Sequence, residues 1–167
     1  MQATALIVSS DAGFAETMQE LLQDWGITVA LSRESPPLPP LETEIVLLDI
    51  RQAGSEALHP LLAFREKIPE AEVILINRPD NIPLSIAGMQ AGAADELIAP
   101  FDTSALKNSI SAALGRRKKR QGKKSLLRRF GEAMAAATFA QAGEFDTALS
   151  LLEDDTEAQR PSDRKKP

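Results

Sequence analysis

Along the first 115 residues, short apolar runs alternate with longer segments whose apolar residues recur every three or four positions. The runs are rich in Ile, Leu and Val, which is typical of strands buried on both faces of a parallel sheet. The longer segments have the spacing of amphipathic helices, and Gly115 is expected to end the last of them. This alternation predicts a doubly wound parallel α/β sheet. The predicted strands cover residues 3–8, 27–31, 44–50, 73–76 and 95–98, and the predicted helices cover about 12–24, 57–67, 82–91 and 103–114.

One stretch interrupts the alternation between the second and third strands. Residues 35–40 read Ser-Pro-Pro-Leu-Pro-Pro, and Pro lacks the N–H that a helix interior needs. The second helix of the expected fold is therefore predicted to be shortened to one turn or missing. Such a composition favours polyproline-like backbone, which suits a rigid crossover or a Pro-rich recognition motif, and we favour the crossover.

The run at 44–50 is the only one of these strands in which a buried apolar series closes on an acid, Asp49. In open α/β sheets, ligands bind beyond the carboxyl ends of the strands. Asp49 is thus either a functional group at that edge or the cap of the turn that follows, and the run alone does not separate the two.

Composition narrows the chemistry that the chain can perform. It contains no Cys and a single His, His59, which excludes disulfides, thiolate chemistry and a His metal cluster. It has no glycine-rich phosphate loop and no carboxylate pair with a partner base, so we expect no enzyme activity. No stretch of about 20 apolar residues and no signal-peptide pattern occurs, and we expect a soluble, cytoplasmic protein.

Charge divides the chain into two parts. Residues 1–115 carry 6 Lys and Arg against 16 Asp and Glu, whereas residues 116–167 carry 13 against 8. The overall charge of −5 therefore hides an acidic part of −10 and a basic part of +5. The two parts have different surfaces, and we expect different roles.

Two motifs carry a resemblance to a known family. They are Leu47-Leu48-Asp49-Ile50 and residues 91–101, Ala-Gly-Ala-Ala-Asp-Glu-Leu-Ile-Ala-Pro-Phe. Residues 3–115 resemble the chemotaxis-receiver-like receiver domain of bacterial response regulators. The first motif matches the family's phosphoacceptor strand, and the second is similar to its Gly-Ala-x-Asp-(aromatic)-Leu-x-Lys-Pro-Phe pattern. The resemblance implies a flavodoxin-like sheet in the order 2-1-3-4-5, Asp49 as the phosphoacceptor candidate, and a two-component (phosphorelay) signalling role with a sensor kinase or another signalling protein as partner.

The residues that accompany the acceptor in this family have mostly changed. The family has two Mg²⁺-binding acids after the first strand, a Thr or Ser after the fourth, an aromatic switch residue in the fifth, and a Lys that pairs with the phosphoryl group. The corresponding positions here are Ser9 and Ser10 (with an acid one place later, Asp11), Asn77, Glu96 and Ala99.

These changes point away from phosphoryl transfer. A carboxylate attacks a phosphoryl group only when a cation offsets their mutual repulsion, and Mg²⁺ requires several oxygen ligands. We therefore predict a pseudo-receiver that requires no cofactor, is phosphorylated weakly or not at all at Asp49, and acts by protein–protein docking. The alternative is a working receiver in which Asp11 and Asp49 hold Mg²⁺ weakly.

The remaining residues are predicted to form a basic linker, a helical pair and a tail. Nine of the fourteen residues at 116–129 are Lys or Arg, and we favour a solvated linker there. Its alternative partners are nucleic-acid phosphates, anionic lipid or the acidic receiver. A nucleic-acid-binding regulator stays open, although no aromatic residues interleave with the charges.

Residues 130–153 have the apolar spacing of a tetratricopeptide-like helical hairpin, and Gly143-Glu144-Phe145-Asp146-Thr147-Ala148 is similar to the turn of that repeat. A single unit needs a neighbour to bury its apolar face, so we expect it to dock on the receiver, a partner or a second copy in a homodimer. An ordinary Ala-rich helical pair is the alternative. Residues 154–167 are almost devoid of apolar side chains and are predicted to be disordered.

Overall fold

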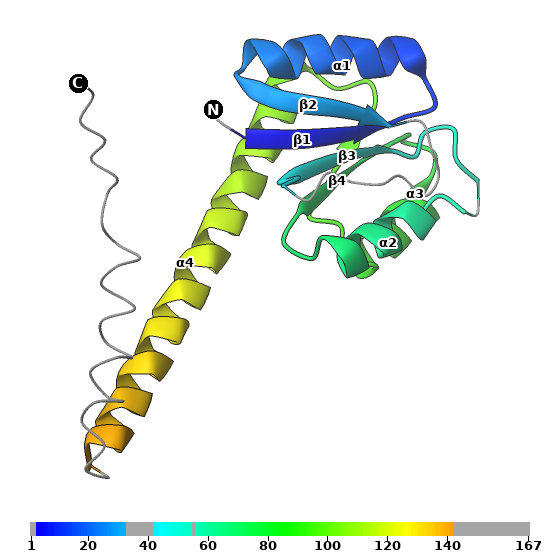
Figure 1. Cartoon of the computed structure of the whole chain (residues 1–167). Helices are drawn as coiled ribbons and strands as arrows, with labels where there is room; N and C mark the ends of the chain where they lie inside the picture. The colour runs from blue at the N-terminus through cyan, green and yellow to red at the C-terminus, as the bar shows by residue number, and fades with distance from the viewer. Residues whose placement is uncertain (1–2, 33–41, 55, 142–167) are drawn as a thin grey trace, which may run out of the picture. The chain divides into compact units, whose positions relative to one another are not determined.

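The computed structural model of the chain describes residues 3–32, 42–54 and 56–141 (Figure 1). The chain divides into two compact units, Met1–Lys118 and Lys119–Pro167. The first unit contains five strands, β1 (Ala3–Val8), β2 (Ile27–Ser32), β3 (Ile45–Asp49), β4 (Glu72–Asn77) and β5 (Asp95–Ile98). Its helices are α1 (Ala12–Asp24), α2 (His59–Lys67), α3 (Ile82–Gln90) and the first part of α4 (Thr103–Gln141).

The five strands form one parallel sheet in the order β2-β1-β3-β4-β5, which confirms the predicted topology. β3 and β4 are buried on both faces because each lies between two neighbours and under helices on either side. Alternate residues of the strands therefore supply two separate cores. One core packs against α1 and the start of α4, and the other packs against α2 and α3 (Figure 1).

Local signals in the sequence set the ends of these elements. The side chain of Asp11 caps α1, because its Oδ1 accepts a hydrogen bond of 3.0 Å from the N–H of Phe14. The turns after α1 and α3 need a positive φ, and glycine occupies both, with φ of 77° at Gly26 and 96° at Gly92. The predicted boundaries agree with the observed ones to within about two residues in all elements but the last.

The helix predicted at about 57–67 is present as α2 (His59–Lys67), and it is the second helix in chain order. The prediction that the second helix is shortened or missing is therefore wrong. Pro60 lies in its first turn, where a missing N–H is tolerated. The Pro-rich stretch at 35–40, to which that prediction was attached, lies outside the described residues.

The last helix is longer than predicted, because α4 continues through Gly115 to Gln141. Gly115 does not adopt a positive φ, and one helical glycine costs only about 1 kcal/mol relative to alanine. The residues that follow are mainly Lys and Arg, which are good helix formers. The segment at 116–129, predicted as a basic linker, is therefore helical.

Two ion pairs at the opposite edge of the sheet from Asp49 fix the point where the basic segment begins. Arg117 binds the carboxylate of Glu44, and Arg116 Nε lies 3.4 Å from Oε2 of Glu72, which is only 2% exposed. Glu44 also accepts a hydrogen bond from the N–H of Thr4. The acidic first unit thus holds the first two residues of the basic segment.

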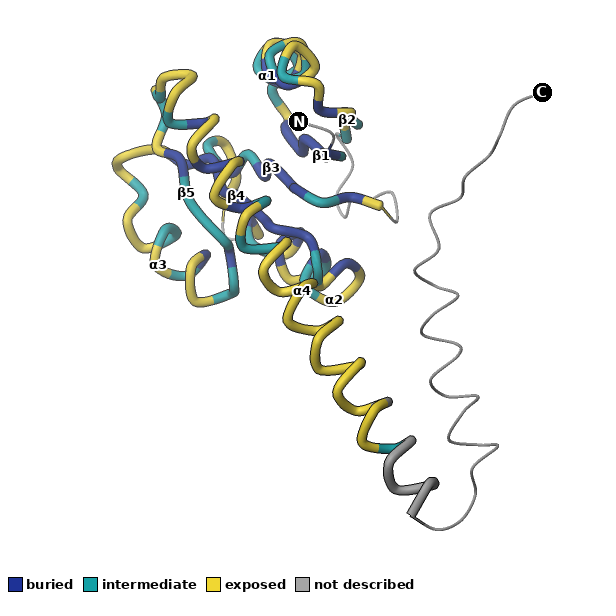
Figure 2. The backbone as a smooth tube through the Cα atoms, turned by 90° about the vertical axis from the view of Figure 1, so that its left-hand side faces the viewer, coloured by how far each residue is buried: buried dark blue, intermediate teal, exposed yellow. Residues whose placement is uncertain are grey.

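Within the second unit, the described residues are helical from 119 to 141. Residues 118–131 are all exposed (Figure 2). The predicted second helix of the hairpin and the predicted disordered tail lie outside the described residues. Over the described part of the chain, no helix has both the length and the apolar character needed to cross a membrane.

Candidate functional site

Asp49 is the last residue of β3 and lies at the carboxyl edge of the sheet, where the sequence placed it. β1 and β4 flank β3, so the residues that follow these two strands surround the carboxylate. Its side chain is 3% exposed. A carboxylate this deeply buried must be paired or must bind hydrogen-bond donors.

The partner of Asp49 is Arg51, two residues along the chain. Arg51 Nε lies 2.9 Å from Asp49 Oδ1 and Arg51 Nη2 lies 2.8 Å from Oδ2, so the guanidinium and the carboxylate meet in a two-pronged pair. The backbone N–H of Arg51 donates a third bond of 3.1 Å to Oδ1. The carboxylate contacts the edge of the guanidinium, and the flat face of the guanidinium lies over the ring of Phe14, with 4.0 Å between the guanidinium carbon and the ring centroid.

The residues after β1 complete this pair. Ser9 is buried, and its hydroxyl lies 2.6 Å from Asp49 Oδ2 as a hydrogen-bond donor. Asp11 Oδ2 accepts a bond of 3.3 Å from Arg51 Nη2, while Asp11 Oδ1 caps α1. Ser10 is exposed. Arg51 therefore bridges the two carboxylates that the sequence offered as metal ligands.

Two opposing effects act on the pKa of Asp49. Burial is the largest single effect and raises it, but the hydrogen bonds from Arg51 and Ser9 together outweigh burial, so the pKa lies below its ordinary value of 3.8. The same pair raises the pKa of Arg51, mainly through its hydrogen bond with Asp49. Asp49 is thus an ionised carboxylate held by a permanent cation.

The two predicted switch positions are bonded to each other. Asn77 is fully buried at the end of β4, and its Nδ2 donates to Glu96 Oε1 on β5 over 3.0 Å. Ser85, on α3, donates to the same oxygen over 2.7 Å. The amide of Asn77 also lies 3.1 Å from the Ser85 hydroxyl. The residues that would sense a phosphoryl group in the family therefore tie β4, β5 and α3 together.

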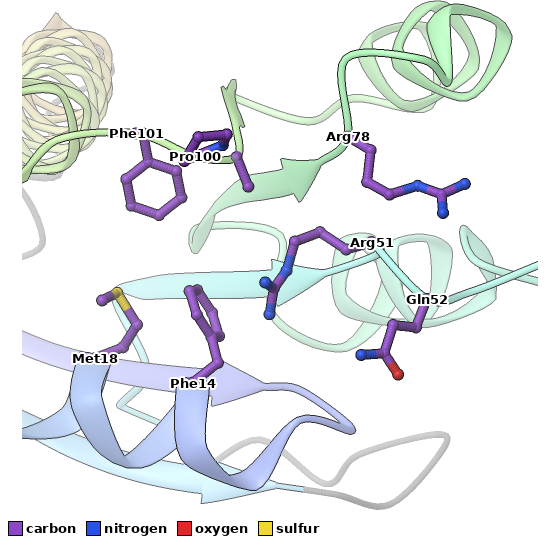
Figure 3. Close-up of a pocket in the computed structure, with 8 residues that line it drawn as sticks. Phe14, Met18, Arg51, Gln52, Arg78, Pro100 and Phe101 are labelled. Atoms are coloured by element: carbon purple, nitrogen blue, oxygen red, sulfur yellow. The ribbon is translucent and has the colours of Figure 1, made fainter.

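Two cavities open at this edge of the sheet. One, of about 300 Å³, lies on the α2 side, and Asp49, Ser9 and Ser10 contribute to its lining. The other, of about 530 Å³, lies between α1 and the loops that follow β3, β4 and β5 (Figure 3). Eight residues line the larger cavity: Phe14, Met18, Arg51, Gln52, Arg78, Ala99, Pro100 and Phe101.

The structure therefore brings Ser9, Asp11 and Asp49 together, pairs Asn77 with Glu96, and places Ala99 in the wall of the larger cavity. Sequence reasoning missed Arg51 and Ser85. An Arg two residues after the candidate acceptor was a usable signal, because a side chain of that length can turn back onto the carboxylate. Among the residues that the structure describes, no group of three or more His, Asp or Glu side chains could hold a metal ion.

Several curated proteins are similar to this chain. ZraR, a transcriptional regulatory protein of Klebsiella oxytoca, is 29% identical over 119 residues, which are 68% of this chain and 26% of ZraR. FixJ, a transcriptional regulatory protein of Azorhizobium caulinodans, is 27% identical over 114 residues, or 66% of this chain and 54% of FixJ. The chain thus spans between about a quarter and a half of the length of these relatives. No protein-family model matches the chain.

Solved structures show the same fold. A response regulator receiver domain protein from Clostridium thermocellum superimposes with a TM-score of 0.64 at 20% identity, covering 70% of this chain and 97% of that one. NtrX from Brucella abortus superimposes with a TM-score of 0.66 at 24% identity, covering 75% of this chain and 30% of NtrX. The sheet order, the position of Asp49 and the sequence relatives agree: the chain is similar to the receiver domains of response regulators of the CheY-like type.

Proposed function

We propose that the chain is a response-regulator receiver of the pseudo-receiver type. In it, Arg51 holds the carboxylate of Asp49 that would otherwise accept a phosphoryl group. Signalling then proceeds by protein–protein docking, without phosphoryl transfer or an enzymatic output. The observation that carries this proposal is the hydrogen bonding of Asp49. Oδ1 accepts from the N–H and Nε of Arg51, and Oδ2 accepts from Nη2 of Arg51 and the hydroxyl of Ser9. A carboxylate has about four lone-pair directions, and these four bonds use them.

Phosphorylation would require that arrangement to open. An attacking oxygen needs a lone pair directed at phosphorus, and Mg²⁺ needs lone pairs on the same carboxylate. Arg51 would have to leave both Asp49 and the Phe14 ring, which would leave a buried carboxylate without its cation until a metal arrived. Ala99 offers no amine to the phosphoryl oxygens that would then need one.

The alternative, a working receiver with Mg²⁺ between Asp11 and Asp49, meets the same obstacle. Both oxygens of Asp11 already accept hydrogen bonds, one from the α1 backbone and one from Arg51. Replacement of Arg51 by Mg²⁺ would leave the metal with these two carboxylates, because in the described part of the chain no third His, Asp or Glu joins them in a group that could hold a metal ion. This observation supports the pseudo-receiver over the metal-dependent alternative.

The phosphorylation test is mass measurement of the intact protein after incubation with acetyl phosphate and Mg²⁺. We expect no phosphoryl adduct on the natural chain. The triple variant Ser10→Asp, Arg51→Met and Ala99→Lys restores an acid and a Lys and removes the guanidinium, and it should gain an adduct of one phosphoryl group. A stoichiometric adduct on the natural chain that is lost in Asp49→Ala would overturn the proposal.

A docking face is available on the helix and strand that follow β4. Ile82, Ile86 and Met89 lie on one side of α3 at exposures of 65%, 55% and 47%, and the neighbouring β5 adds Ile98 at 39%. Contiguous exposed apolar side chains of this kind mark interaction surfaces. The family relationship favours a sensor kinase or another signalling protein as partner, and a second copy of the chain is the simplest alternative.

Self-association through this face can be measured with a matched pair of variants. Ile86→Glu places a charge on the α3 face, whereas Leu62→Glu makes the same change on α2 at a similar exposure of 53%. If the face forms a homodimer, light scattering should show that Ile86→Glu alone is monomeric. A monomeric natural chain would leave the face to a different partner protein.

The second unit is proposed to supply another contact through a hairpin at 130–153 that follows the basic segment. Leu126, Leu127, Phe130 and Met134 are 55% to 67% exposed on the described part of α4. Residues 143–159 carry six acids and no base, next to apolar residues at 145, 148, 149 and 152. This composition complements both the apolar side chains and the basic residues of α4, which supports a helical pair.

A further inference from the structure

We propose that the larger cavity at the carboxyl edge of the sheet is a binding site for a small anionic molecule with an aromatic body, such as an aromatic carboxylate. The cavity has a volume of about 530 Å³, which falls in the range of small-molecule sites. It lies beyond the carboxyl ends of parallel strands, where open α/β sheets bind ligands. The inference is separate from the pseudo-receiver proposal, because it concerns occupancy of the cavity and not the reactivity of Asp49.

The lining of the cavity is divided into an apolar and a polar side. Figure 3 shows Phe14, Met18, Pro100 and Phe101 on one side, with Arg78 and Gln52 on the other and Arg51 between them. A ligand that fills the cavity must therefore be apolar at one end and polar at the other.

The apolar side carries two aromatic rings. The rings of Phe14 and Phe101 meet edge to face, with 6.5 Å between their centroids and an angle of 88° between their planes. Both residues line the cavity, and an aromatic guest packs favourably against such rings, either offset-stacked or edge to face. Met18 adds a polarizable and adaptable wall.

The polar side selects for negative charge. None of the eight lining residues is acidic, and two are Arg. Asp11 and Asp49 lie nearby, but both accept hydrogen bonds from Arg51 and neither lines the cavity. Arg78 is 54% exposed and its ion pair with Asp80, at 3.3 Å, is also exposed. Such a pair is weak, so a ligand carboxylate can replace it as the partner of Arg78.

Ala99 is the residue that leaves room for the ligand. It is half-buried in the cavity wall at the position where the resemblance places a Lys. Because Ala99 lines the cavity, a long side chain at this position would compete with a ligand for the same space. The short side chain that offers no amine to a phosphoryl group therefore also leaves space for a ligand.

Methionine methyl signals provide a direct test. The chain has four Met residues, of which Met18 lines the cavity, while Met89 and Met134 lie on exposed apolar surfaces. We propose titration of the full chain, labelled with ¹³C at the Met methyl groups, with 1-naphthoate and with neutral 1-naphthalenemethanol. The Met18 signal should shift saturably with naphthoate, and the neutral probe should bind about tenfold more weakly because it lacks the charge-assisted bonds.

Two variants locate the site, and one serves as control. Ala99→Leu should weaken naphthoate binding at least tenfold by filling the cavity, and Arg78→Met should weaken it about tenfold without touching the core. Leu62→Glu, on the exposed surface of α2 and away from the cavity lining, should leave the affinity unchanged. The proposal is overturned if Met18 does not shift, if Met89 or Met134 shifts in its place, if both probes bind equally, or if Arg78→Met has no effect.

Discussion

The pairing of Arg51 with Asp49 predicts a large loss of stability when the guanidinium alone is removed. Arg51→Met keeps most of the side-chain length and its contact with the Phe14 ring, but deletes the two side-chain bonds to Asp49 and the one to Asp11. Asp49, whose side chain is 3% exposed in the natural chain, then keeps only the Ser9 hydroxyl and a backbone N–H as donors.

The magnitude follows from what stays and what is lost. Removal of one partner from a buried ion pair costs about 3–5 kcal/mol. Arg51 is 20% exposed and two hydrogen bonds to Asp49 survive, so we expect the free energy of unfolding to fall by about 2–4 kcal/mol at pH 7. Arg78→Met is the matched control, because Arg78 is exposed and paired with an exposed acid, and it should cost less than about 0.5 kcal/mol.

The pH dependence of the stability difference provides a second, independent test of this prediction. In Arg51→Met, burial becomes the dominant effect and raises the pKa of Asp49 above 3.8. A raised carboxyl pKa destabilises the fold fully above that pKa, and the penalty fades as the pH falls from the raised pKa toward the ordinary value of 3.8. The stability difference between the natural chain and Arg51→Met should therefore narrow as the pH is lowered from 7 toward about 4.

Urea unfolding followed by the fluorescence of Trp25 measures both effects, because Trp25 packs against the core of the first unit and is the only Trp in the chain. If Arg51→Met is as stable as Arg78→Met at pH 7, the guanidinium does not hold Asp49. The central observation behind the pseudo-receiver proposal would then be lost.

Three further predictions address the same fold. The pKa of Asp49 lies below 3.8 in the folded chain, so the ionised carboxylate contributes its full stabilisation above pH 3.8 and loses it as the pH falls through the folded pKa. Urea titrations at stepped pH should therefore show that the stability advantage of the natural chain over Asp49→Asn shrinks below about pH 4. Gly115→Ala should raise the free energy of unfolding by about 0.5–1 kcal/mol, because the backbone is helical there and an alanine Cβ meets no atom within 4 Å. A decrease of similar size in the free energy of unfolding would show that Gly115 ends the helix. Glu44→Gln should cost about 1–2 kcal/mol and speed amide exchange in α4 around Arg117, because it leaves a half-buried guanidinium with a neutral partner, and unchanged exchange there would contradict this role for the pair.

Much of the fold was predictable because its signals are local. Strands such as β3 and β4 are continuous apolar runs, and only a parallel sheet covered on both faces buries every residue of such a run. Helix α1 carries its own cap and its own terminating glycine, Asp11 and Gly26. The position of Asp49 at the sheet edge followed from the same pattern, since the strand ends where the apolar run ends.

The end of the last helix was not predictable in this way. Glycine is common at the ends of helices, so Gly115 predicts a helix end. The dense row of Lys and Arg after it predicts repulsion between like charges, which also argues against a continuous helix. The structure continues the helix, and Arg116 and Arg117 reach acids that precede them by 44 and 73 residues. Such distant partners leave no trace in local periodicity.

For the candidate site, the sequence by itself determined which chemistry had been removed, and the tertiary structure decided what replaced it. The sequence alone shows which residue types replace those of the family at four positions: Ser9, Asn77, Glu96 and Ala99. That Arg51 turns back onto Asp49, stacks on Phe14 and reaches Asp11 depends on the fold, which brings Asp11 and Phe14, at the start of α1, beside the loop that follows β3. The partner of a buried charge is chosen by which side chains the fold brings within a few ångströms; the spacing of two residues makes Arg51 a candidate partner of Asp49, but only the folded arrangement selects it.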